Sequence, residues 1–500
     1  MASTWSRSWH AAVDLGASSA RVIAGRYQNG RLEMRELARF ANRPIMLPDG
    51  FHWDLVGLFG DTVGALAKGC SSLEIASVGI DGWAVDYCLL DADGRLLGLP
   101  YCYRDPRTAE PLRKVLADFG AWGLYEATGI QILALNTLFQ LIADLATPAY
   151  LAASTMLLLP DAFVFLLTGK RQMEATNAST TQLFDVRDFS TAKAIWKRFG
   201  LREDLLAPMV WPGHFSGRPL KAIAAHFGLP SDLEVVTVAS HDTASAVAAV
   251  PAEESFAFVS AGTWSLVGAE LQAPLITEAS LRLGFSNEVG VDGTYRFLRN
   301  VMGYWIVQEC ERYWRDLGDE GLRRVRVEAE RRRPFELVVD ADHPGFHLVG
   351  GMPKRIANYL SATGQQVPSE PGGILRAAVD GVVLATARAV EDLVMLSGLT
   401  PRCLHVIGGG SAHSEFCLLL ASAVGLPVVA GPKEASSVGN LLMQIRAAEP
   451  GMTLAEARSI VAASVDTVVY EPDPRLARLA RAALERLGGL VEERGRLAGL

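Results

Sequence analysis

Residues 12–19 read Ala-Val-Asp-Leu-Gly-Ala-Ser-Ser, and residues 258–265 read Phe-Val-Ser-Ala-Gly-Thr-Trp-Ser. Each stretch is a short apolar run that ends in a small or acidic residue, followed by a glycine and hydroxyl side chains. This pattern is typical of a strand that enters a tight turn, and the backbone N–H groups and hydroxyls of such a turn suit an anion. Two copies favour a duplicated phosphate-binding fold with its ligand between the halves, although so short a repeat also arises by chance.

The composition indicates a globular protein. A chain of 500 residues predicts two or three domains, and 50% apolar with 20% charged residues is not typical of a disordered chain. The formal net charge of -8 gives no general attraction to nucleic acid or to an anionic membrane. We therefore expect neither as a partner, and a phosphorylated substrate needs local positive charge, backbone donors or a metal.

Several signals indicate a cytoplasmic location. No apolar run is long enough to span a bilayer, and Asp14 interrupts the first apolar stretch, which is not typical of a signal peptide. The cysteines show neither CxxC spacing nor a His/Cys cluster, which favours buried, reduced thiols. They are Cys70, Cys88, Cys102, Cys310, Cys403 and Cys417.

The first half alternates strand-like runs with turns. Residues 11–27, 31–40 and 76–91 predict strands, and helical patterns follow them, which is typical of an α/β domain with a mixed sheet. A further apolar strand over 233–239 meets Ser-His-Asp-Thr before a helical run over 244–250. We place the domain boundary at this junction.

The second half repeats this pattern. Residues 256–271 predict paired strands, 301–317 a helix, and 374–396 an amphipathic helix that Gly398 ends. The tail from Pro474 reads as a further helix that docks on the body of the protein. The arginine-rich run 323–333 predicts a solvated helix face rather than a nucleic-acid site.

Asp14 ends the first predicted strand just before Gly16. A carboxylate beside a phosphate-binding bend can hold the Mg²⁺ of a nucleotide directly or through water, and a simple turn-forming aspartate is the alternative. The second copy of the repeat has Ser260 at this position, so we expect the first copy to face the metal. The turn over 17–21 adds backbone N–H groups, hydroxyls and the cation of Arg21. The Walker sequence GxxxxGK[ST] is absent, which argues against a P-loop nucleotidase.

Asp242 stands between His241 and Thr243 at the predicted strand-to-helix junction. A helix N-cap is the simple interpretation, but consecutive polar residues at the end of an apolar strand are also typical of an active-site edge. The nearby helix dipole keeps such a carboxylate ionised, so that it can accept a proton from an alcohol attacking phosphorus. That role suits a loose phosphoryl-transfer transition state, in which the proton leaves late.

Glycines mark two further candidate turns. Residues 408–410 are three glycines after a predicted strand, and they permit close approach to a flat ring or a phosphate, or form a flexible turn. Residues 431–437 read Gly-Pro-Lys-Glu-Ala-Ser-Ser and begin a helix. We interpret this second segment as structural.

Taken together, these motifs resemble those of the FGGY family of carbohydrate kinases, within the actin-like ATPase superfamily. The likeness is strongest to the members that phosphorylate L-rhamnulose. The matching segments follow one another in order over most of the chain. They are 13–21, 79–86, 103–108, 129–131, 136–138, 160–161, 167–170, 176–183, 239–247, 262–266, 299–303, 408–410 and 435–440.

The resemblance implies a fold, an activity and cofactors. The fold is α/β, with two duplicated actin-like (ribonuclease H-like) domains and an active-site cleft between them. Residues 1–244 form the domain for sugar and phosphate, 245–465 the nucleotide domain, and 466–500 a helical tail. The activity is transfer of the γ-phosphate of ATP, with Mg²⁺, to the 1-hydroxyl of a small-molecule ketose. The resemblance further implies a monomer or homodimer.

The resemblance also assigns site residues, position by position. Asp242 is the catalytic base, and Asp14 helps to place Mg²⁺. The sugar contacts are Ala84, His241, Thr243 and Asn300. The ATP contacts are Ala17, Ser18, Ser19, Ala20, Arg21, Thr263, Gln308 and Gly409.

Three residues depart from the family pattern. The members that phosphorylate L-rhamnulose read Gly-Ile-Asp-Thr-Trp-Gly-Val-Asp, whereas here Gly82 replaces the threonine and Ala84 the second glycine; Ala20 replaces a glycine of the phosphate turn. A changed sugar pocket can change which epimer is accepted, so L-fuculose or another ketose is the alternative substrate. A non-catalytic actin-fold ATPase or sugar sensor is a further alternative, but it has no need of Ser240-His-Asp-Thr243.

Overall fold

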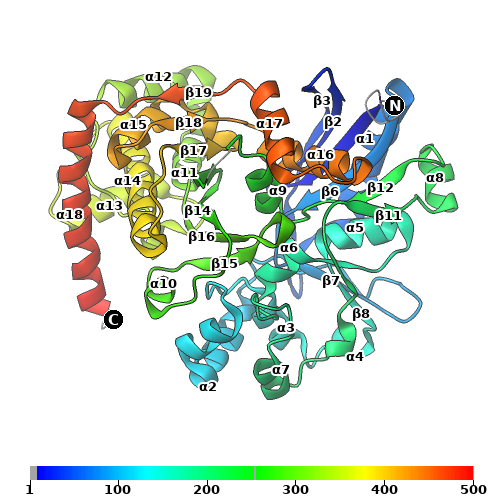
Figure 1. Ribbon diagram of the computed structural model, residues 1–500. Coiled ribbons are helices and arrows are strands. Elements are labelled where there is room, and N and C mark those ends of the chain that lie inside the picture. Colours follow the sequence, from blue (N-terminus) through cyan, green and yellow to red (C-terminus); the bar gives the residue numbers. More distant parts are fainter. Residues whose placement is uncertain (1–7, 253–254, 499–500) are drawn as a thin grey trace. The chain divides into compact units, whose positions relative to one another are not determined.

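The computed structural model describes residues 8–252 and 255–498, which form two compact units (Figure 1). The first unit comprises the described residues of Met1–Glu254, Glu270–Phe297 and Glu434–Val465. The second comprises those of Ser255–Ala269, Leu298–Lys433 and Asp466–Leu500. Both units are discontinuous in sequence, and the contiguous domains 1–244, 245–465 and 466–500 stay a prediction.

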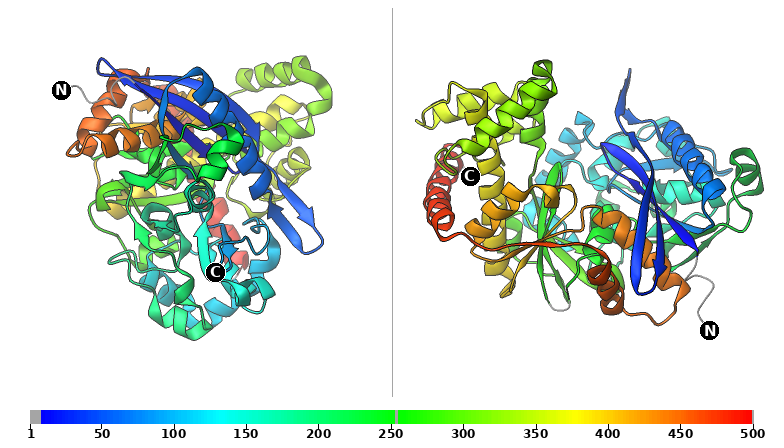
Figure 2. Two further views of the ribbon diagram at one scale, coloured as in Figure 1. Left: turned by 90° about the vertical axis from the view of Figure 1, so that its right-hand side faces the viewer. Right: turned by 90° about the horizontal axis from the view of Figure 1, so that it is seen from above.

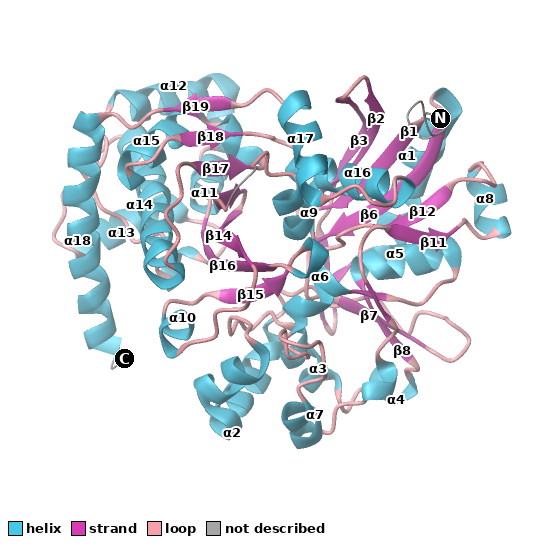
Figure 3. Ribbon diagram, viewed as in Figure 1, coloured by secondary structure: helices cyan, strands magenta, loops and turns pink. Residues whose placement is uncertain are grey.

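The first unit is built on a six-stranded mixed sheet (Figure 3). Strand β1 is antiparallel to β2 and parallel to β6, and all of its residues are buried, as its apolar sequence predicts. In spatial order the strands are β11 (His214–Gly217), β12 (Glu234–Thr237), β6 (Ile75–Gly82), β1 (Trp9–Leu15), β2 (Ser19–Gln28) and β3 (Arg31–Ala41).

Shorter strands and twelve helices complete the first unit. The strands are β4 (Pro44–Leu47), β5 (Gly50–Trp53), β7 (Tyr87–Leu90), β8 (Thr155–Leu158), β9 (Met173–Glu174), β10 (Met209–Val210) and β15 (Ser286–Val289). The helices are α1 (Leu55–Ser72), α2 (Ala109–Thr128), α3 (Thr137–Asp144), α4 (Pro148–Ala152), α5 (Leu159–Thr168), α6 (Ala175–Ala178), α7 (Lys193–Phe199), α8 (Lys221–Phe227), α9 (Asp242–Ala248), α10 (Glu278–Arg282), α16 (Ala435–Ala448) and α17 (Leu454–Ser464).

The side chains of the central strands alternate between two faces of the sheet. Val13 of β1 and Val22 of β2 belong to the same core cluster as Leu66 of α1, and Figure 2 shows α1 running along the sheet. Ala12 lies in a separate core cluster with Leu441 of α16. Helix α1 and helix α16 therefore cover opposite faces, and α16 also contacts β6 and β12.

Helices α9 and α16 approach each other at Gly439. A Cβ on Gly439 would lie 1.7 Å from the carbonyl oxygen of Ser245 in α9. We expect Gly439→Ala to lower the free energy of unfolding by about 3 kcal/mol, because overpacking forces the two helices apart. The midpoint of urea unfolding, followed by circular dichroism, measures this effect.

The matched control is Gly60→Ala in α1, where an added Cβ meets no atom within 4 Å. It replaces a helical glycine with a better helix former, so we expect no loss of stability. Equal unfolding midpoints for the two variants would contradict close packing of α9 on α16.

The second unit contains a sheet with the same central arrangement. Strand β13 is antiparallel to β14 and parallel to β17, as β1 is to β2 and β6. In spatial order its strands are β16 (Tyr295–Met302), β14 (Trp264–Leu271), β13 (Ala257–Ala261), β17 (Leu404–Ile407), β18 (Val428–Ala430) and β19 (Val468–Tyr470). Residues 295–297 of β16 and 270–271 of β14 belong to the first unit. Its helices are α11 (Trp305–Tyr313), α12 (Gly318–Arg331), α13 (Met352–Ala362), α14 (Pro371–Ser397), α15 (Ser414–Val424) and α18 (Pro474–Ala498). The two copies of the repeat thus form equivalent hairpins, which confirms the predicted duplication.

Most predicted elements of the second half are confirmed. Helix α14 ends at Gly398, which adopts φ 69°, and the tail forms α18. The start of the helix predicted over 301–317 is wrong: Val301 and Met302 still belong to β16, and α11 begins at Trp305. Strand pairing with the sheet overrides the local helical pattern there.

Two further findings concern thiols and membranes. All six cysteines are free thiols, four of them buried. Over residues 8–252 and 255–498, none of the helices combines the length and the apolar character that crossing a membrane requires.

Candidate active site

Asp14, Arg21 and Asp81 lie on the face of the first sheet that α16 covers. In strand register, Asp14 is beside Arg21 of β2 and beside Asp81 of β6. Residues two apart in a strand share a face, so Asp14 shares the face of Ala12, and Asp81 shares that of Gly79, whose Cβ position is directed at α16. The register of the sheet therefore brings these charged side chains together near the ends of β1 and β6.

Asp14 is buried, with 1% of its surface exposed. Arg21 Nε lies 3.1 Å from Asp14 Oδ2, and the same guanidinium also contacts Glu434, which accepts a hydrogen bond from Arg39 at 2.9 Å. Burial raises the pKa of Asp14 to about 6; Arg21 opposes this shift, and the charge of Asp242 adds to it. Two carboxylates thus already hold Arg21, and its contact with ATP stays a prediction.

Asp81 is a second buried carboxylate on this face. Its Oδ2 accepts a hydrogen bond of 2.6 Å from Asn440 of α16, while Oδ1 has no hydrogen-bond partner among the described residues. Burial raises the pKa of Asp81 well above its usual value, and the charges of Asp14 and Asp242 raise it further. Three carboxylates therefore influence one another at this edge of the sheet.

Asp242 is the first residue of α9, and His241 is the N-cap residue, without a side-chain cap bond. Asp242 is therefore not the N-cap that the simplest interpretation of the sequence suggested. The chain before α9 is joined to the end of β6, because the Gly82 N–H donates to the Ser240 carbonyl at 2.9 Å. The Asp242 side chain is 32% exposed, and its Oδ1 accepts a 3.0 Å hydrogen bond from Thr243. Of the three carboxylates, it is the one that an external alcohol can reach.

The predicted phosphate turn joins β1 to β2. The Gly16 N–H donates to the Ser19 carbonyl at 3.1 Å, and the Asn42 side chain donates to the Gly16 carbonyl at 3.0 Å. Ser18 is exposed, and Ala17 is partly exposed. Ala20, by contrast, lies in β2 with its side chain fully buried in the core, so that only its backbone is available to a ligand.

Ala84, a predicted sugar contact, is partly exposed in a segment that buried groups hold rigidly. Asp86 Oδ2 accepts hydrogen bonds from the indole N–H groups of Trp53 at 2.6 Å and Trp83 at 2.9 Å. Burial raises the pKa of Asp86 to about 6, although these bonds oppose the shift. Val85 adopts φ 70°, an unfavourable conformation for a β-branched residue. Strain of this kind persists where the surroundings enforce it.

Four predicted contacts lie in the second unit, namely Thr263, Gln308, Asn300 and Gly409. Thr263 follows β13, and its Oγ1 lies 3.5 Å from Oε1 of the exposed Gln308 in α11, so the structure brings these two predicted nucleotide contacts together. Asn300 lies in β16 and is partly exposed.

Gly409 is exposed in the glycine turn that follows β17. Gly408 adopts φ 79°, and a Cβ on Gly410 would lie 2.4 Å from the Cβ of Ala261 at the end of β13. Gly408 and Gly410 therefore permit a close approach of the turn to β13. Nearby, the rings of Tyr304 and His413 stack with centroids 4.4 Å apart.

Several residues around this site were not expected from the sequence. Glu434 lies in a segment that we interpreted as structural, and Asp81 and Asn440 belong to matching segments but received no role. Glu288 and Arg296 contact His241 from β15 and β16. A carboxylate or amide within an otherwise apolar strand or helix is the signal that could have identified Asp81 and Asn440.

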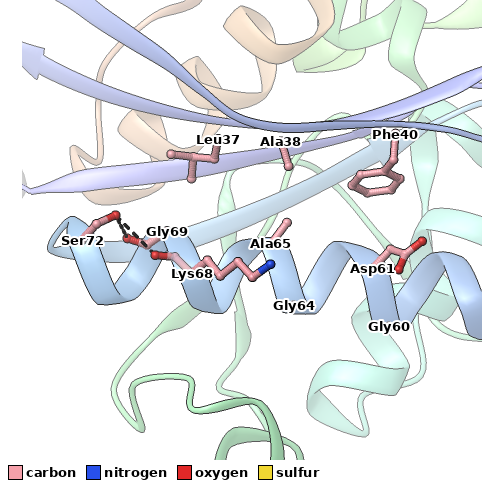
Figure 4. Close-up of a pocket in the computed structure, with 10 residues that line it drawn as sticks. All are labelled: Leu37, Ala38, Phe40, Gly60, Asp61, Gly64, Ala65, Lys68, Gly69 and Ser72. Carbon is pink, nitrogen blue, oxygen red and sulfur yellow. Dashed lines mark hydrogen bonds between the residues drawn. The ribbon is translucent and has the colours of Figure 1, made fainter.

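A groove of about 560 Å³ lies elsewhere in the first unit, between α1 and β3 (Figure 4). Its lining includes Leu37 and Phe40 from β3 and Gly64 from α1, with Lys68 and Asp61 as its charged side chains. None of the predicted site residues lines it.

Comparison with known proteins identifies the family. Residues 10–249 match the FGGY family of carbohydrate kinases, N-terminal domain, and residues 257–448 match its C-terminal domain. The chain is 38% identical to the rhamnulokinase of Bacteroides thetaiotaomicron, over 92% of this chain and 95% of that protein. It is 36% identical to the rhamnulokinase of Enterococcus faecalis, over 93% and 94% of the two chains.

The fold has close structural relatives. The xylulose kinase of Lactobacillus acidophilus superposes with a TM-score of 0.81 at 15% sequence identity, covering 98% of both chains. The duplicated strand–turn–strand units, the carboxylates at the sheet edge and the match over both halves lead to one assignment. The chain belongs to the FGGY family of carbohydrate kinases.

Proposed function

We propose that this kinase transfers the γ-phosphate of Mg-ATP to the 1-hydroxyl of L-rhamnulose. The observation that carries this proposal is its similarity, at 34–38% identity over more than nine-tenths of the chain, to relatives named rhamnulokinase. ATP and free ketoses occur together in the cytoplasm, where we propose that the protein acts as a monomer or a homodimer.

Asp242 is the proposed base. Its partly exposed carboxylate accepts the proton of the 1-hydroxyl, while Thr243 Oγ1 holds Oδ1 at 3.0 Å and leaves Oδ2 for the substrate. Ala84, His241, Thr243 and Asn300 bind the sugar. Charge develops late on the attacking oxygen in a loose transition state, so a weak base in the correct position suffices.

Asp14 is the proposed metal contact. Its Oδ2, which forms an ion pair with Arg21, and Asp81 Oδ1 are buried and make no hydrogen bond among the described residues. Carboxylate oxygens are ligands that Mg²⁺ prefers. Within the described chain, no group of three His, Cys, Asp or Glu side chains is arranged to hold a metal ion. When bound, Mg²⁺ neutralises charge on the phosphate oxygens.

Turns, together with Gln308 of α11, supply the proposed nucleotide contacts. Residues 17–21 of the first turn bind the phosphates, through the backbone at Ala20, and Arg21 adds its positive charge. Thr263, Gln308 and Gly409 bind the rest of the nucleotide.

A panel of ketoses tests the substrate. We expect kcat/KM for L-rhamnulose to exceed that for L-fuculose, L-ribulose and D-xylulose by about 10-fold or more, because each buried polar group left without its hydroxyl partner costs on the order of 1–3 kcal/mol. ADP release measures turnover, and NMR of the product locates the phosphate. A preference for another ketose would rule out L-rhamnulose as the substrate but would leave the assignment as a sugar kinase unchanged.

L-fuculose is the second candidate, because two residues near the proposed sugar site depart from the relatives' pattern. A Cβ on Gly82 would lie 2.9 Å from the backbone oxygen of Leu15, so the threonine of the pattern does not fit without a shift of β1. Ala84 adds a methyl group at a partly exposed position. Both changes alter the shape of the polar pocket.

A further inference from the structure

Arg296 of β16 carries a guanidinium group with none of its surface exposed. Its Nε and Nη2 donate to the Val289 carbonyl at 3.2 and 3.1 Å, and Nη2 also donates to the Thr176 carbonyl at 3.2 Å. A buried charge is costly unless it is paired. Its partner is Glu288, whose Oε2 lies 3.0 Å from Nη1.

An N–H of Arg296 Nη1 is directed at His241 rather than at Glu288. It donates to His241 Nδ1 at 3.0 Å. Glu288 Oε2 lies 3.4 Å from the same ring nitrogen and has no aligned hydrogen bond among the described residues. Because a guanidinium donates and never accepts, Nδ1 must be the acceptor. The proton of the neutral imidazole therefore lies on Nε2.

The protonated Nε2 of His241 faces Asp242, with 3.4 Å between Nε2 and Oδ1. In this tautomer the ring nitrogen nearest the carboxylate carries the proton and attracts it, whereas in the other tautomer that nitrogen carries a lone pair and repels it. Glu288 favours that other tautomer, since an ionised carboxylate accepts a hydrogen bond from a protonated Nδ1. Burial raises the pKa of Glu288, but Arg296 and His241 outweigh burial and lower it below its usual value, so Glu288 is ionised.

We propose that Arg296 is a positioning residue that fixes the Nε2–H tautomer of His241 and so orients the carboxylate of Asp242. Arg296 and Glu288 compete for one ring nitrogen, and the aligned hydrogen bond of Arg296 decides the outcome. This inference rests on the proposed role of Asp242 and deepens it.

Three variants of the full chain separate positioning from folding. Arg296→Met leaves Glu288 as the remaining partner of Nδ1, so we expect the other tautomer and a loss of kcat on the order of 100-fold. Arg296→Met/Glu288→Gln is charge-balanced, and the glutamine amide can donate to Nδ1, so we expect recovery of Nε2–H and of at least a tenth of the wild-type kcat. Arg296→Met/Glu288→Leu is charge-balanced as well but supplies no donor, and we expect no recovery.

The tautomer is read directly from imidazole ¹⁵N shifts in protein labelled at its nine histidines. The signals that disappear in His241→Gln identify His241. We expect Nδ1 to show the shift of an unprotonated nitrogen in the wild type and in the glutamine double variant, and the shift of a protonated nitrogen in Arg296→Met. Melting temperatures show whether the two double variants fold equally well.

The outcomes are distinguishable. If the leucine and glutamine double variants have equal kcat and equal ¹⁵N shifts, Arg296 has a structural role and the inference is wrong. If Arg296→Met does not fold, the comparison of the two charge-balanced variants still decides. If Asp242→Asn retains full turnover, the proposed role of Asp242 as the base fails, whichever tautomer His241 adopts. If the wild type releases no ADP with any ketose, the proposed function itself fails.

Discussion

Asp242→Asn is expected to lower kcat by about 10²- to 10⁴-fold, the usual contribution of a general base. Asparagine has the same shape as aspartate but cannot take the proton of the sugar hydroxyl. The Asp242 side chain is one-third exposed at the start of α9, so the substitution disturbs little packing. The KM values for sugar and ATP should change little, because the lost interaction acts in the transition state. Coupled detection of ADP and calorimetric titration of both substrates measure the two quantities.

The matched control is Asp61→Asn on the exposed surface of α1. We expect wild-type kcat for this variant, since Asp61 is not among the site residues. Asp242→Asn with more than a tenth of wild-type kcat would rule out Asp242 as the base.

Asp14→Asn is expected to lower kcat by about 10²-fold or more and to raise the Mg²⁺ concentration needed for half-maximal activity. A metal ion contributes several kcal/mol of charge stabilisation in the transition state, and about 1.4 kcal/mol corresponds to tenfold in rate. Asparagine keeps one oxygen but loses the charge that attracts the cation. Titration of activity with MgCl₂ at saturating ATP measures both effects.

Glu434→Gln is the control for the loss of an ion pair, because Arg21 contacts both Asp14 and Glu434. It weakens the hold on Arg21 but leaves the Asp14 carboxylate in place. We expect its half-saturating Mg²⁺ concentration to stay within about twofold of wild type, well inside 1 kcal/mol. Equal shifts in the two variants would mean that Asp14 acts through Arg21 and not on the metal.

Much of the fold is predictable because its central strands have local sequence signals. The buried run that contains Val13 is apolar, and so is the run that contains Val259; each is followed by a glycine at a hairpin turn. The helix that ends at Gly398 has its own periodicity and its own stop signal. By contrast, Val301 and Met302 satisfy a helical pattern locally but pair within a sheet, and their assignment depends on distant strands.

The candidate site also contains some residues that local sequence signals predict and others that depend on distant parts of the chain. Asp14 lies near the end of β1, and Asp242 begins α9 shortly after β12. Such junctions after apolar strands are visible in the sequence. Glu434 contacts Arg21 across 413 positions of sequence, and Arg296 reaches His241 across 55. Nothing local distinguishes these two residues from ordinary surface charges.

The sequence by itself determined the duplicated α/β architecture, the membership in a kinase family and the identity of the proposed base, because strand periodicity, turn chemistry and motif order are local properties. Only the tertiary structure decided which groups surround that base. Strand register places Asp81 beside Asp14, the docking of α16 brings Asn440 to Asp81, and burial of Arg296 aims its N–H at His241. Those contacts depend on how helices and strands that are far apart in sequence pack together. Local residue patterns do not predict that packing.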